Sequence, residues 1–303
     1  MRALILSRKP TLYSTRRLVS AVEAAGGEAV VLDPLACWLA CGRKDPAVYH
    51  GATAQRVPEV DVVIPRVGPG ATEHGLSVVR QFDVMSVAVL NGAHAIARSR
   101  DKLRSLQCLS RHDVDIPKTV MVRSPEQMPA ALRCCSGPPV ILKLLRGTQG
   151  VGVMLAETQA AVESILHTVW ALGHDLIVQE FVAESRGRDI RALVVGDRVI
   201  ASMRRVAPIG EFRSNIHRGA VGTAIDLPSA YARVAIEATR IMGLDVAGVD
   251  MLESSAGPKV VEINSSPGFE GLERATGVDV AGAIVARAAA LADARLDGSR
   301  VHA

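Results

Sequence analysis

The sequence predicts a mixed fold that is α/β at its N-terminal end and α+β in the remainder. Strand-like and helical patterns alternate through the first ninety or so residues, and short strand patterns that can pair as hairpins dominate the rest. A length of 303 residues corresponds to about two domains. With 49% hydrophobic and 22% charged residues, the composition is that of a folded globular protein and argues against disorder.

Charge and hydropathy argue against two classes of protein. The 35 basic and 31 acidic side chains leave a net charge of +4, which is too small to indicate a nucleic-acid-binding surface. No uninterrupted apolar stretch reaches the ~18 residues of a membrane span, and the apolar run Ala3–Leu6 is too short for a signal peptide. Five cysteines without framework spacing fit a reducing compartment. We therefore expect a cytoplasmic protein that binds neither membrane nor nucleic acid.

The first part of the chain is expected to form a small βαβ domain. Strand patterns cover Leu4–Leu6, Ala29–Leu32 and Val60–Ile64. Between the first two strands, a helical pattern runs from Arg17 to Ala25 and is closed by two glycines.

A second unit is expected to open at a helix that Ser99 caps, with Asp101 complementing its positive end. Apolar strands at 139–145 and 153–156 enclose a glycine-rich segment, which predicts a hairpin with a long tip. A helix at 159–172 and a strand at 176–182 follow.

The third part is expected to consist of hairpins and helices. Gly196-Asp197 lies between two strand patterns and predicts a hairpin. Pro228 begins a helix that ends before Gly243. The remaining expected elements are strands Val246–Leu252 and Lys259–Ile263, paired antiparallel, a helix at 280–291 and a tail from 297.

Two carboxylates and an amide are expected to meet on that antiparallel strand pair. Glu262 and Asn264 share one face of their strand because side chains alternate, and Asp250 lies on the neighbouring strand. Like charges this close favour a cation between them, and an all-oxygen ligand set favours magnesium or manganese over zinc. The alternative is that the three are solvated polar residues that never meet.

Lys143 lies within an apolar strand, immediately before the glycine-rich segment. It either reaches solvent at a sheet edge or points into a polar cleft. Gly147, Gly150 and Gly152 would let backbone N–H groups approach phosphate oxygens, although no Walker motif closes the segment. The alternative is a tip that is simply flexible.

A basic cluster lies between residues 204 and 219 and holds four arginines and one histidine. Such a density suits bidentate recognition of carboxylate or phosphate groups. A solvated basic loop is the alternative.

Taken in order, these segments resemble the RimK-type ATP-grasp ligases over nearly the whole chain. The segments that carry the resemblance are Ile5–Arg8 with Thr11–Ser14, Val63–Arg66, Ala97–Leu103, Gly147–Gly150, Gln179–Phe181, Asp189–Arg191, Gly210–Gly219, Asp245–Met251 and Glu262–Gly268. The resemblance implies an ATP-grasp fold preceded by a Rossmann-like pre-ATP-grasp βαβ domain. It divides the chain into that domain (1–96), an ATP-grasp N-lobe with a glycine-rich lid (97–180), a C-lobe with the metal site (181–293) and a tail (294–303).

The resemblance also implies roles for individual residues. Lys143 and Lys102 would contact the ATP phosphates, the glycines at 147, 150 and 152 would belong to the lid, and Glu180 and Phe181 would read adenine through their backbone. In this sequence Val182-Ala183 replaces a lysine that is common in the family after that pair. The remaining implied residues are Asp189 near the ribose, Arg213, Ser214 and Asn215 on the nucleotide phosphates, and Asp250, Glu262 and Asn264 on two Mg²⁺ or Mn²⁺ ions.

The activity that the resemblance implies is ATP-dependent addition of L-glutamate to the C-terminus of a small-subunit ribosomal protein through an acyl phosphate. Arg213 would stabilise the developing charge as a catalytic residue, and the assembly would be a homotetramer. Charge and loop position make Arg66, Arg205, His217 and Arg218 candidates for holding glutamate or the acidic acceptor tail. Alternatives are a free poly-α-glutamate synthase, a ligase for another amino acid, and a non-catalytic nucleotide-binding, ribosome-associated regulator.

Overall fold

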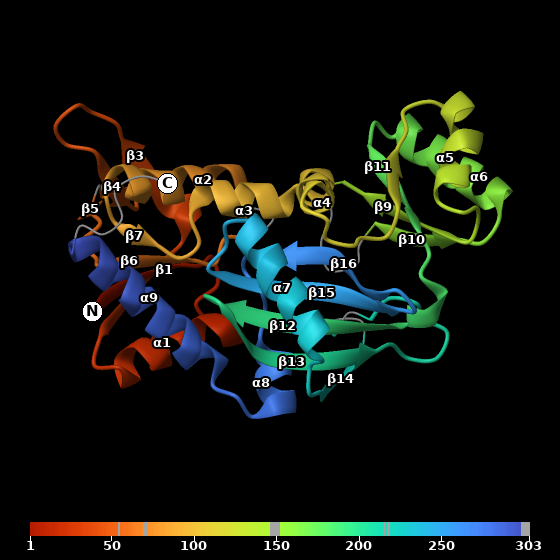
Figure 1. Ribbon diagram of the computed structural model, residues 1–303. Coiled ribbons are helices and arrows are strands. Elements are labelled where there is room, and N and C mark those ends of the chain that lie inside the picture. The colour runs from red at the N-terminus through yellow and green to blue at the C-terminus, as the bar shows by residue number, and fades with distance from the viewer. Residues whose placement is uncertain (54, 69–71, 146–151, 215, 217–218, 298–303) are drawn as a thin grey trace.

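The computed structural model describes the whole chain except residues 54, 69–71, 146–151, 215, 217–218 and 298–303. These described residues form four β-sheets. Figure 1 shows the N-terminal domain and a four-stranded sheet with α5 and α6 at opposite ends of the molecule. A five-stranded sheet lies between these two ends.

The N-terminal domain is built on the expected parallel sheet, in the strand order β2-β1-β6-β7. Strand β1 is completely buried from Ala3 to Leu6, because helices cover both faces of a parallel sheet. The predicted helix begins at Tyr13, four residues before the expected start. The elements are β1 (Arg2–Leu6), α1 (Tyr13–Ala24), β2 (Glu28–Leu32), β6 (Val62–Pro65), α2 (Thr72–Val84), β7 (Ala88–Val89) and α3 (Ala93–Arg100).

A small antiparallel sheet that the sequence did not predict extends from this domain. A 3-10 helix (Pro34–Ala36) leads into β3 (Cys37–Ala40), which pairs with β4 (Ala47–His50), and β4 pairs with β5 (Gln55–Arg56). Trp38 and Tyr49 stack across the first pair with ring centroids 4.2 Å apart.

The expected helix cap at Ser99 is wrong. Ser99 lies inside α3, and its hydroxyl donates to the carbonyl of Ile96. Asp101 is the cap of the next helix, α4 (Lys102–Arg111), where its Oδ1 accepts the backbone N–H of Arg104 at 3.0 Å. The chain therefore bends at Asp101 between two short helices.

The four-stranded antiparallel sheet, called the small sheet below, has the order β10-β9-β11-β8. Its β9–β10 hairpin confirms the predicted strands, and the predicted tip with Gly147 and Gly150 lies outside the described residues. Gly152 has a φ of +75°, and a Cβ there would lie 2.6 Å from Leu144. The elements are β8 (Thr119–Met121), a 3-10 helix (Pro125–Gln127), α5 (Met128–Cys134), β9 (Val140–Leu144), β10 (Val153–Ala156), α6 (Gln159–Ala171) and β11 (Leu176–Glu180).

The five-stranded antiparallel sheet, called the central sheet below, has the order β14-β13-β12-β15-β16. Both predicted hairpins are present, and β15 pairs with β16 as expected. The helix predicted from Pro228 is α7. The elements are a 3-10 helix (Ala183–Ser185), β12 (Arg188–Val195), β13 (Arg198–Val206), β14 (Val221–Ala224), α7 (Ser229–Ile241), β15 (Val246–Ser254), β16 (Gly257–Asn264), α8 (Glu270–Thr276) and α9 (Val280–Leu296).

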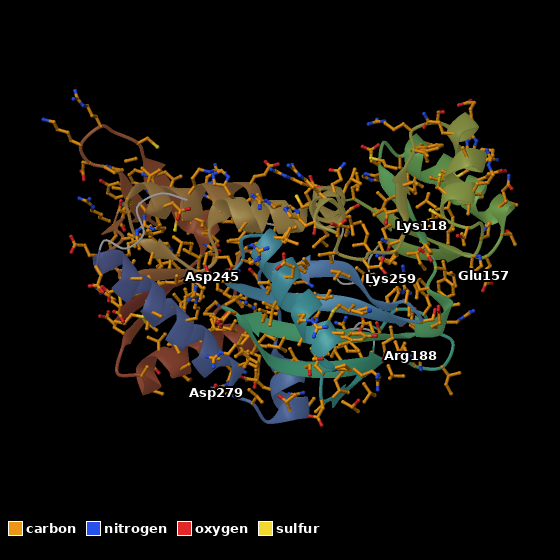
Figure 2. The ribbon with its side chains drawn as sticks, in the orientation of Figure 1. Lys118, Glu157, Arg188, Asp245, Lys259 and Asp279 are labelled. Carbon is orange, nitrogen blue, oxygen red and sulfur yellow. The ribbon has the colours of Figure 1, made fainter. Side chains whose placement is uncertain are left out.

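The last helix returns to the N-terminal domain and shares a hydrophobic core with it. In Figure 2, Asp245 lies between that domain and the central sheet, where Arg287 of α9 pairs with it. Within the described ranges, no single helix has the length and apolar character needed to cross a membrane. The helices Glu270–Thr276 and Val280–Arg295, which are bent relative to each other, reach that length and apolar character only when they are taken together. The division at 96/97, 180/181 and 293/294 stays a prediction.

Candidate active site

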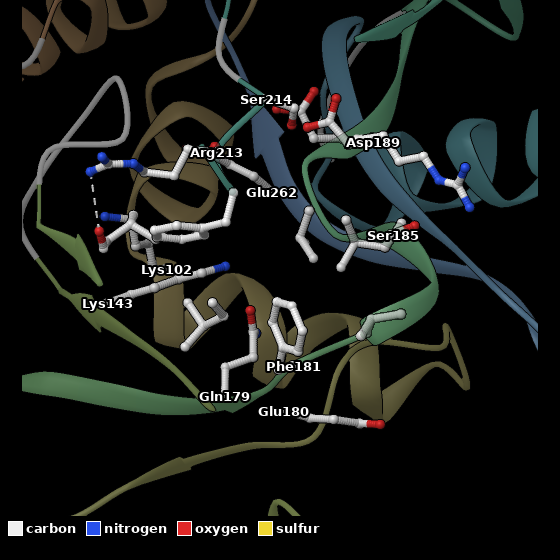
Figure 3. A pocket seen from close by; sticks show the side chains of 18 of the residues that line it. Lys102, Lys143, Gln179, Glu180, Phe181, Ser185, Asp189, Arg213, Ser214 and Glu262 are labelled. Carbon is white, nitrogen blue, oxygen red and sulfur yellow. Dashed lines mark hydrogen bonds between the residues drawn. The ribbon is translucent and has the colours of Figure 1, made fainter. Parts of the chain in front are cut away.

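A cleft lies between the small sheet and the central sheet (Figure 3). It encloses about 1080 Å³ of empty space, including its open mouth. Apolar side chains line its inner part, and charged side chains gather around them, as is typical of small-molecule sites. The apolar residues include Ile141, Val153, Ile177, Phe181, Leu252 and Val261, and the charged ones include Lys102, Lys143, Asp189, Arg205, Arg213, Asp250 and Glu262.

The small sheet and α4 bring two lysines into the cleft. Lys143 extends from β9, and burial lowers its pKa to about 8 although Glu262 opposes the shift. Lys102 begins α4, and its Nζ donates to the carbonyl of Leu144 at 3.0 Å. Burial lowers the pKa of Lys102 as well, against the attraction of Glu262. The cleft thus holds two ammonium groups in an environment that disfavours their charge, which suits an anionic ligand.

The segment that leaves β11 forms the connection between the two sheets. Gln179 donates to the hydroxyl of Thr119 at 2.7 Å and is buried. The Glu180 carboxylate accepts the backbone N–H of Lys118 at 3.0 Å, and in Figure 3 it points away from the lysines. Phe181 lines the cleft, followed by the buried Val182. This segment can offer its backbone and an aromatic face, but not the Glu180 carboxylate, to a ligand.

Charged residues of alternating sign lie side by side on one face of the central sheet. Arg205 of β13 holds both oxygens of Asp189 of β12, at 2.6 and 2.5 Å, and its Nη2 lies 3.0 Å from Asp250. Arg191 of β12 then holds both oxygens of Asp250 of β15, at 2.7 and 2.6 Å. Arg205 is only 2% exposed, so its guanidinium binds carboxylates of the protein. The sequence did not predict Arg191 as a site residue. Arg191 lies opposite Asp250 because β12 pairs with β15, and that pairing of distant segments is visible only in the folded structure.

Three of the predicted site residues lie on the paired strands β15 and β16. Asp250 is the register partner of Glu262, as expected, and Gly248 is the partner of Asn264. A Cβ on Gly248 would lie 2.8 Å from Pro267, so glycine permits the close approach of the loop after β16. Asp250 and Glu262 line the cleft, whereas Asn264 is not among the described residues that line it, so a shared ligand set of all three stays a prediction.

Burial and the two arginines set the ionisation of these carboxylates. Burial alone would raise the pKa of Asp250, but Arg191 and Arg205 hold it below its usual range. Burial, and then Asp250, raise the pKa of Glu262. Glu262 is exposed, and it is one of the residues that line the cleft. The burial that acts on it comes from the protein atoms around the cleft. Burial likewise raises the pKa of Asp189 against the attraction of Arg205.

The residues fit a hard divalent cation by donor chemistry. Asp250, Glu262 and Asn264 offer only oxygen ligands, and the Nδ2 of Asn264 is buried without a hydrogen-bond partner. Nδ2 is a hydrogen-bond donor, so a bond to the cation would come from Oδ1 of the same amide. In the described part of the chain, no three or more His, Cys, Asp or Glu residues form a metal-binding group, so the set depends on the amide.

A loop after β13 links the two walls of the cleft. Arg213 holds Glu211 with two hydrogen bonds of 2.9 and 2.8 Å, and its Nη1 donates to the carbonyl of Val153 on β10 at 3.4 Å (Figure 3). The hydrogen bond from Arg213 lowers the pKa of Glu211 to about 2. Ser214 lies beside Asp189 in the cleft, where it acts with Arg205 against the rise in the Asp189 pKa that burial causes. The predicted residues Asn215, His217 and Arg218 lie outside the described residues.

Arg66 lies at the junction of the N-terminal domain and the loop after β16. Its guanidinium donates to the Ser14 hydroxyl at 3.2 Å and to the carbonyl of Pro267 at 2.7 Å, above the Phe269 ring. Burial lowers its pKa to about 10. Arg66 is not among the described residues that line the cleft, and its contact with Pro267 places it beside the loop that follows Asn264.

The architecture is that of ATP-grasp ligases. The ATP-grasp ligase PsnB, solved with a minimal precursor, Mg and ADP, superposes with a TM-score of 0.73 at 19% identity over 96% of this chain and 98% of that chain. D-alanine–D-alanine ligase from Bacillus anthracis, solved with ATP, gives 0.68 at 13% identity over 98% and 99%. The RimK domain ATP-grasp protein from Sphaerobacter thermophilus gives 0.73 at 25% identity over 95% and 99%. The expected ATP-grasp fold is confirmed.

Residues 1–96 match the RimK PreATP-grasp domain, and residues 99–288 match the RimK-like ATP-grasp domain. The chain therefore belongs to the RimK-like family of ATP-grasp proteins, and it is an ATP-dependent ligase. A relative from Rhodopirellula baltica is 51% identical over 94% of this chain and 70% of its own length. A relative from Pseudomonas paraeruginosa is 49% identical over 94% of both chains, and both relatives are named probable alpha-L-glutamate ligase.

Proposed function

We propose that this protein is an α-L-glutamate ligase that uses ATP to join L-glutamate to the C-terminal carboxylate of an acceptor. The observation that carries the proposal is the cleft in which Lys102 and Lys143 face Asp250 and Glu262. Such a cleft can hold a polyphosphate together with a hard cation. The names of the relatives at 49–51% identity support glutamate as the amino acid.

A carboxylate is a poor electrophile in water, so one of its oxygens must first be converted into a good leaving group. A carboxylate oxygen of the acceptor attacks the γ-phosphorus of ATP, and the bond to ADP breaks, which gives an acyl phosphate. The neutral α-amine of glutamate then attacks the acyl carbon, phosphate leaves with the carbon–oxygen bonding pair, and a peptide bond results. The proton that the amine loses passes to the departing phosphate or to water. No nucleophile of the enzyme takes part.

The basic residues of the cleft are proposed to hold the phosphates. Lys143 and Lys102 contact the phosphate oxygens, and Arg213 stabilises the charge that develops during transfer. Ser214 and Asn215 support this contact, Gly147, Gly150 and Gly152 belong to the lid, and Glu180 and Phe181 contact adenine through the connecting segment. Asp189 is proposed to lie near the ribose.

Asp250, Glu262 and Asn264 would hold Mg²⁺ or Mn²⁺, with two ions expected. When bound, such an ion draws charge from the phosphate oxygens. The protein's own contribution is to keep Asp250 ionised, because the arginines beside it hold its pKa low. These ligands also favour an active enzyme over a non-catalytic regulator on the same fold.

The proposed acceptor is the acidic C-terminal tail of a small-subunit ribosomal protein, as the family resemblance implies. Arg66 is proposed to hold the incoming glutamate or the acceptor tail, together with His217 and Arg218. Arg205, predicted for the same role, is instead proposed to hold Asp189 and Asp250, because it is buried between them. Cytoplasmic location and a homotetramer belong to the same proposal.

The test is a magnesium-dependent ADP-release assay over a panel of amino acids, with and without an acceptor peptide that ends in glutamates, followed by mass measurement. We expect release with glutamate and peptide, and product masses raised by whole glutamate residues. Products without the peptide would indicate a poly-α-glutamate synthase, and release with another amino acid would indicate a different ligase. Absence of release with every amino acid would contradict the proposal.

A further inference from the structure

The Asp250 carboxylate is bound by two arginines of the central sheet. Arg191 contacts both oxygens in a bidentate pair, and Arg205 adds a third contact while it also holds Asp189. Asp250 is 3% exposed, so no bulk water screens these contacts. Two guanidinium groups therefore balance the charges of two carboxylates within a buried row.

The hydrogen bonds leave Asp250 one position at which it can bind a further partner. Its Oδ2 accepts from Nη2 of Arg191 at 2.6 Å and lies 3.0 Å from Nη2 of Arg205, while Oδ1 accepts, from the described residues, a single hydrogen bond, from Nε of Arg191 at 2.7 Å. A carboxylate offers about four lone-pair positions. One position on Oδ1 remains, so Asp250 can bind an ion while both guanidiniums stay in place.

The remaining carboxylate of the predicted ligand set is also surrounded by positive charge. Among the described residues, Arg191, Lys143 and Lys102 attract Glu262, and Asp250 repels it. Asn264 brings no charge. In the ranges that the structure describes, the negative charge of the ligands is thus already balanced by neighbouring cations. A divalent ion that binds without a nucleotide would therefore gain only a small electrostatic attraction to offset the loss of its hydration shell.

We infer that Arg191 and Arg205 keep the divalent-ion site incomplete until a nucleotide supplies phosphate charge, so that ion and nucleotide bind together. This inference rests on the ligand set of the proposed function. Arg191 is then a positioning residue that acts through Asp250. Because coupling between two ligands is reciprocal, the ion must strengthen nucleotide binding by the same factor.

The first test is a Mn²⁺ titration of the full chain by electron paramagnetic resonance, with and without ADP. We expect Mn²⁺ to bind at least about ten-fold more tightly with ADP, within the usual range of coupling between sites. Equal Mn²⁺ affinity with and without ADP would overturn the inference. The readout does not depend on ligase activity, so a failure of the proposed glutamate reaction would be seen separately.

The second test compares two substitutions of the same arginine. Arg191→Met removes the charge, and we expect it to strengthen Mn²⁺ binding without ADP by about ten-fold and to reduce the effect of ADP. Arg191→Lys keeps the charge and is expected to resemble the unchanged protein. A folded Arg191→Met protein with unchanged Mn²⁺ binding would refute the role of Arg191.

A third substitution separates this inference from the ligand assignment itself. Asp250→Asn is expected to weaken Mn²⁺ binding in the presence of ADP. If it does not, the ligand set of the proposed function is wrong. Should Arg191→Met not fold, the effect of ADP on the unchanged protein still decides the inference.

Discussion

The two walls of the cleft carry charge in different ways. On the small sheet, no carboxylate among the described residues forms an ion pair with Lys143, and burial disfavours its charge. On the central sheet, Asp189, Arg205, Asp250 and Arg191 bind one another. Lys143 of the first wall is therefore available to an anionic ligand, whereas the two arginines of the second wall already bind carboxylates of the protein.

Because of this difference, removal of a positive charge should have opposite effects on stability at the two walls of the same site. Removal of a cation from the central sheet leaves buried carboxylates without a partner. Removal of the Lys143 cation takes away a charge that burial disfavours, so it should not destabilise the fold. The following experiments measure that contrast.

The largest effect is expected for Arg205→Met. The substitution leaves Asp189 without its bidentate partner and Asp250 with one arginine, and breaking a buried pair costs about 3–5 kcal/mol. The free energy of unfolding from urea denaturation measures the loss. The control is Arg240→Met, which breaks an exposed pair with Glu237 and should cost far less, because water already screens that pair. Equal losses in the two variants would show that the buried row does not stabilise the fold.

Next in size is the effect of Glu262→Gln on turnover. Loss of one anionic ion ligand should raise the barrier by several kcal/mol, which lowers ADP release at saturating magnesium at least about 100-fold. Glu253→Gln is the matched control, because Glu253 lies on β15 and pairs with Arg204 instead. Turnover of Glu262→Gln close to that of the control would remove Glu262 from the ion site.

Lys143→Met tests the opposite wall. A charge-assisted hydrogen bond to phosphate contributes about 1.5–3 kcal/mol, so the dissociation constant for ADP should rise about 10- to 100-fold. The melting temperature should stay equal or rise, because a buried charge without an ion-pair partner is removed. Lys118→Met, at an exposed lysine away from the cleft lysines, is the control. A marked loss of stability would contradict the contrast between the walls.

The smallest effect is a pH dependence of nucleotide binding. Lys143 has a pKa of about 8 without nucleotide. Phosphate stabilises the protonated amine, so the pKa rises on binding, and affinity falls as pH increases between the two values. We expect ADP to bind about ten-fold more weakly at about pH 9 than at about pH 7, measured by calorimetry. Lys143→Arg keeps its charge and should flatten the profile; an unchanged slope would assign the effect to another group.

Much of the site could be read from local patterns. Two strand patterns separated by a turn predict that Asp250 and Glu262 lie opposite each other, and the β15–β16 register confirms it. The missed sheet β3–β5 had no comparable signal. Its short strands are fixed by burial of Cys37 and Val48 against Leu76 and Phe82 of α2, which come later in the chain.

Local sequence patterns establish which chemical groups are present, which strands carry them, and the order of segments that indicates the family. Which of those charges are already paired depends on how the sheets assemble. Arg191 and Asp250 are 59 residues apart, and Arg205 reaches both acids only because β13, β12 and β15 lie side by side. The strength of an ion pair depends on distance and burial, and for segments so far apart both are set by how the sheets assemble.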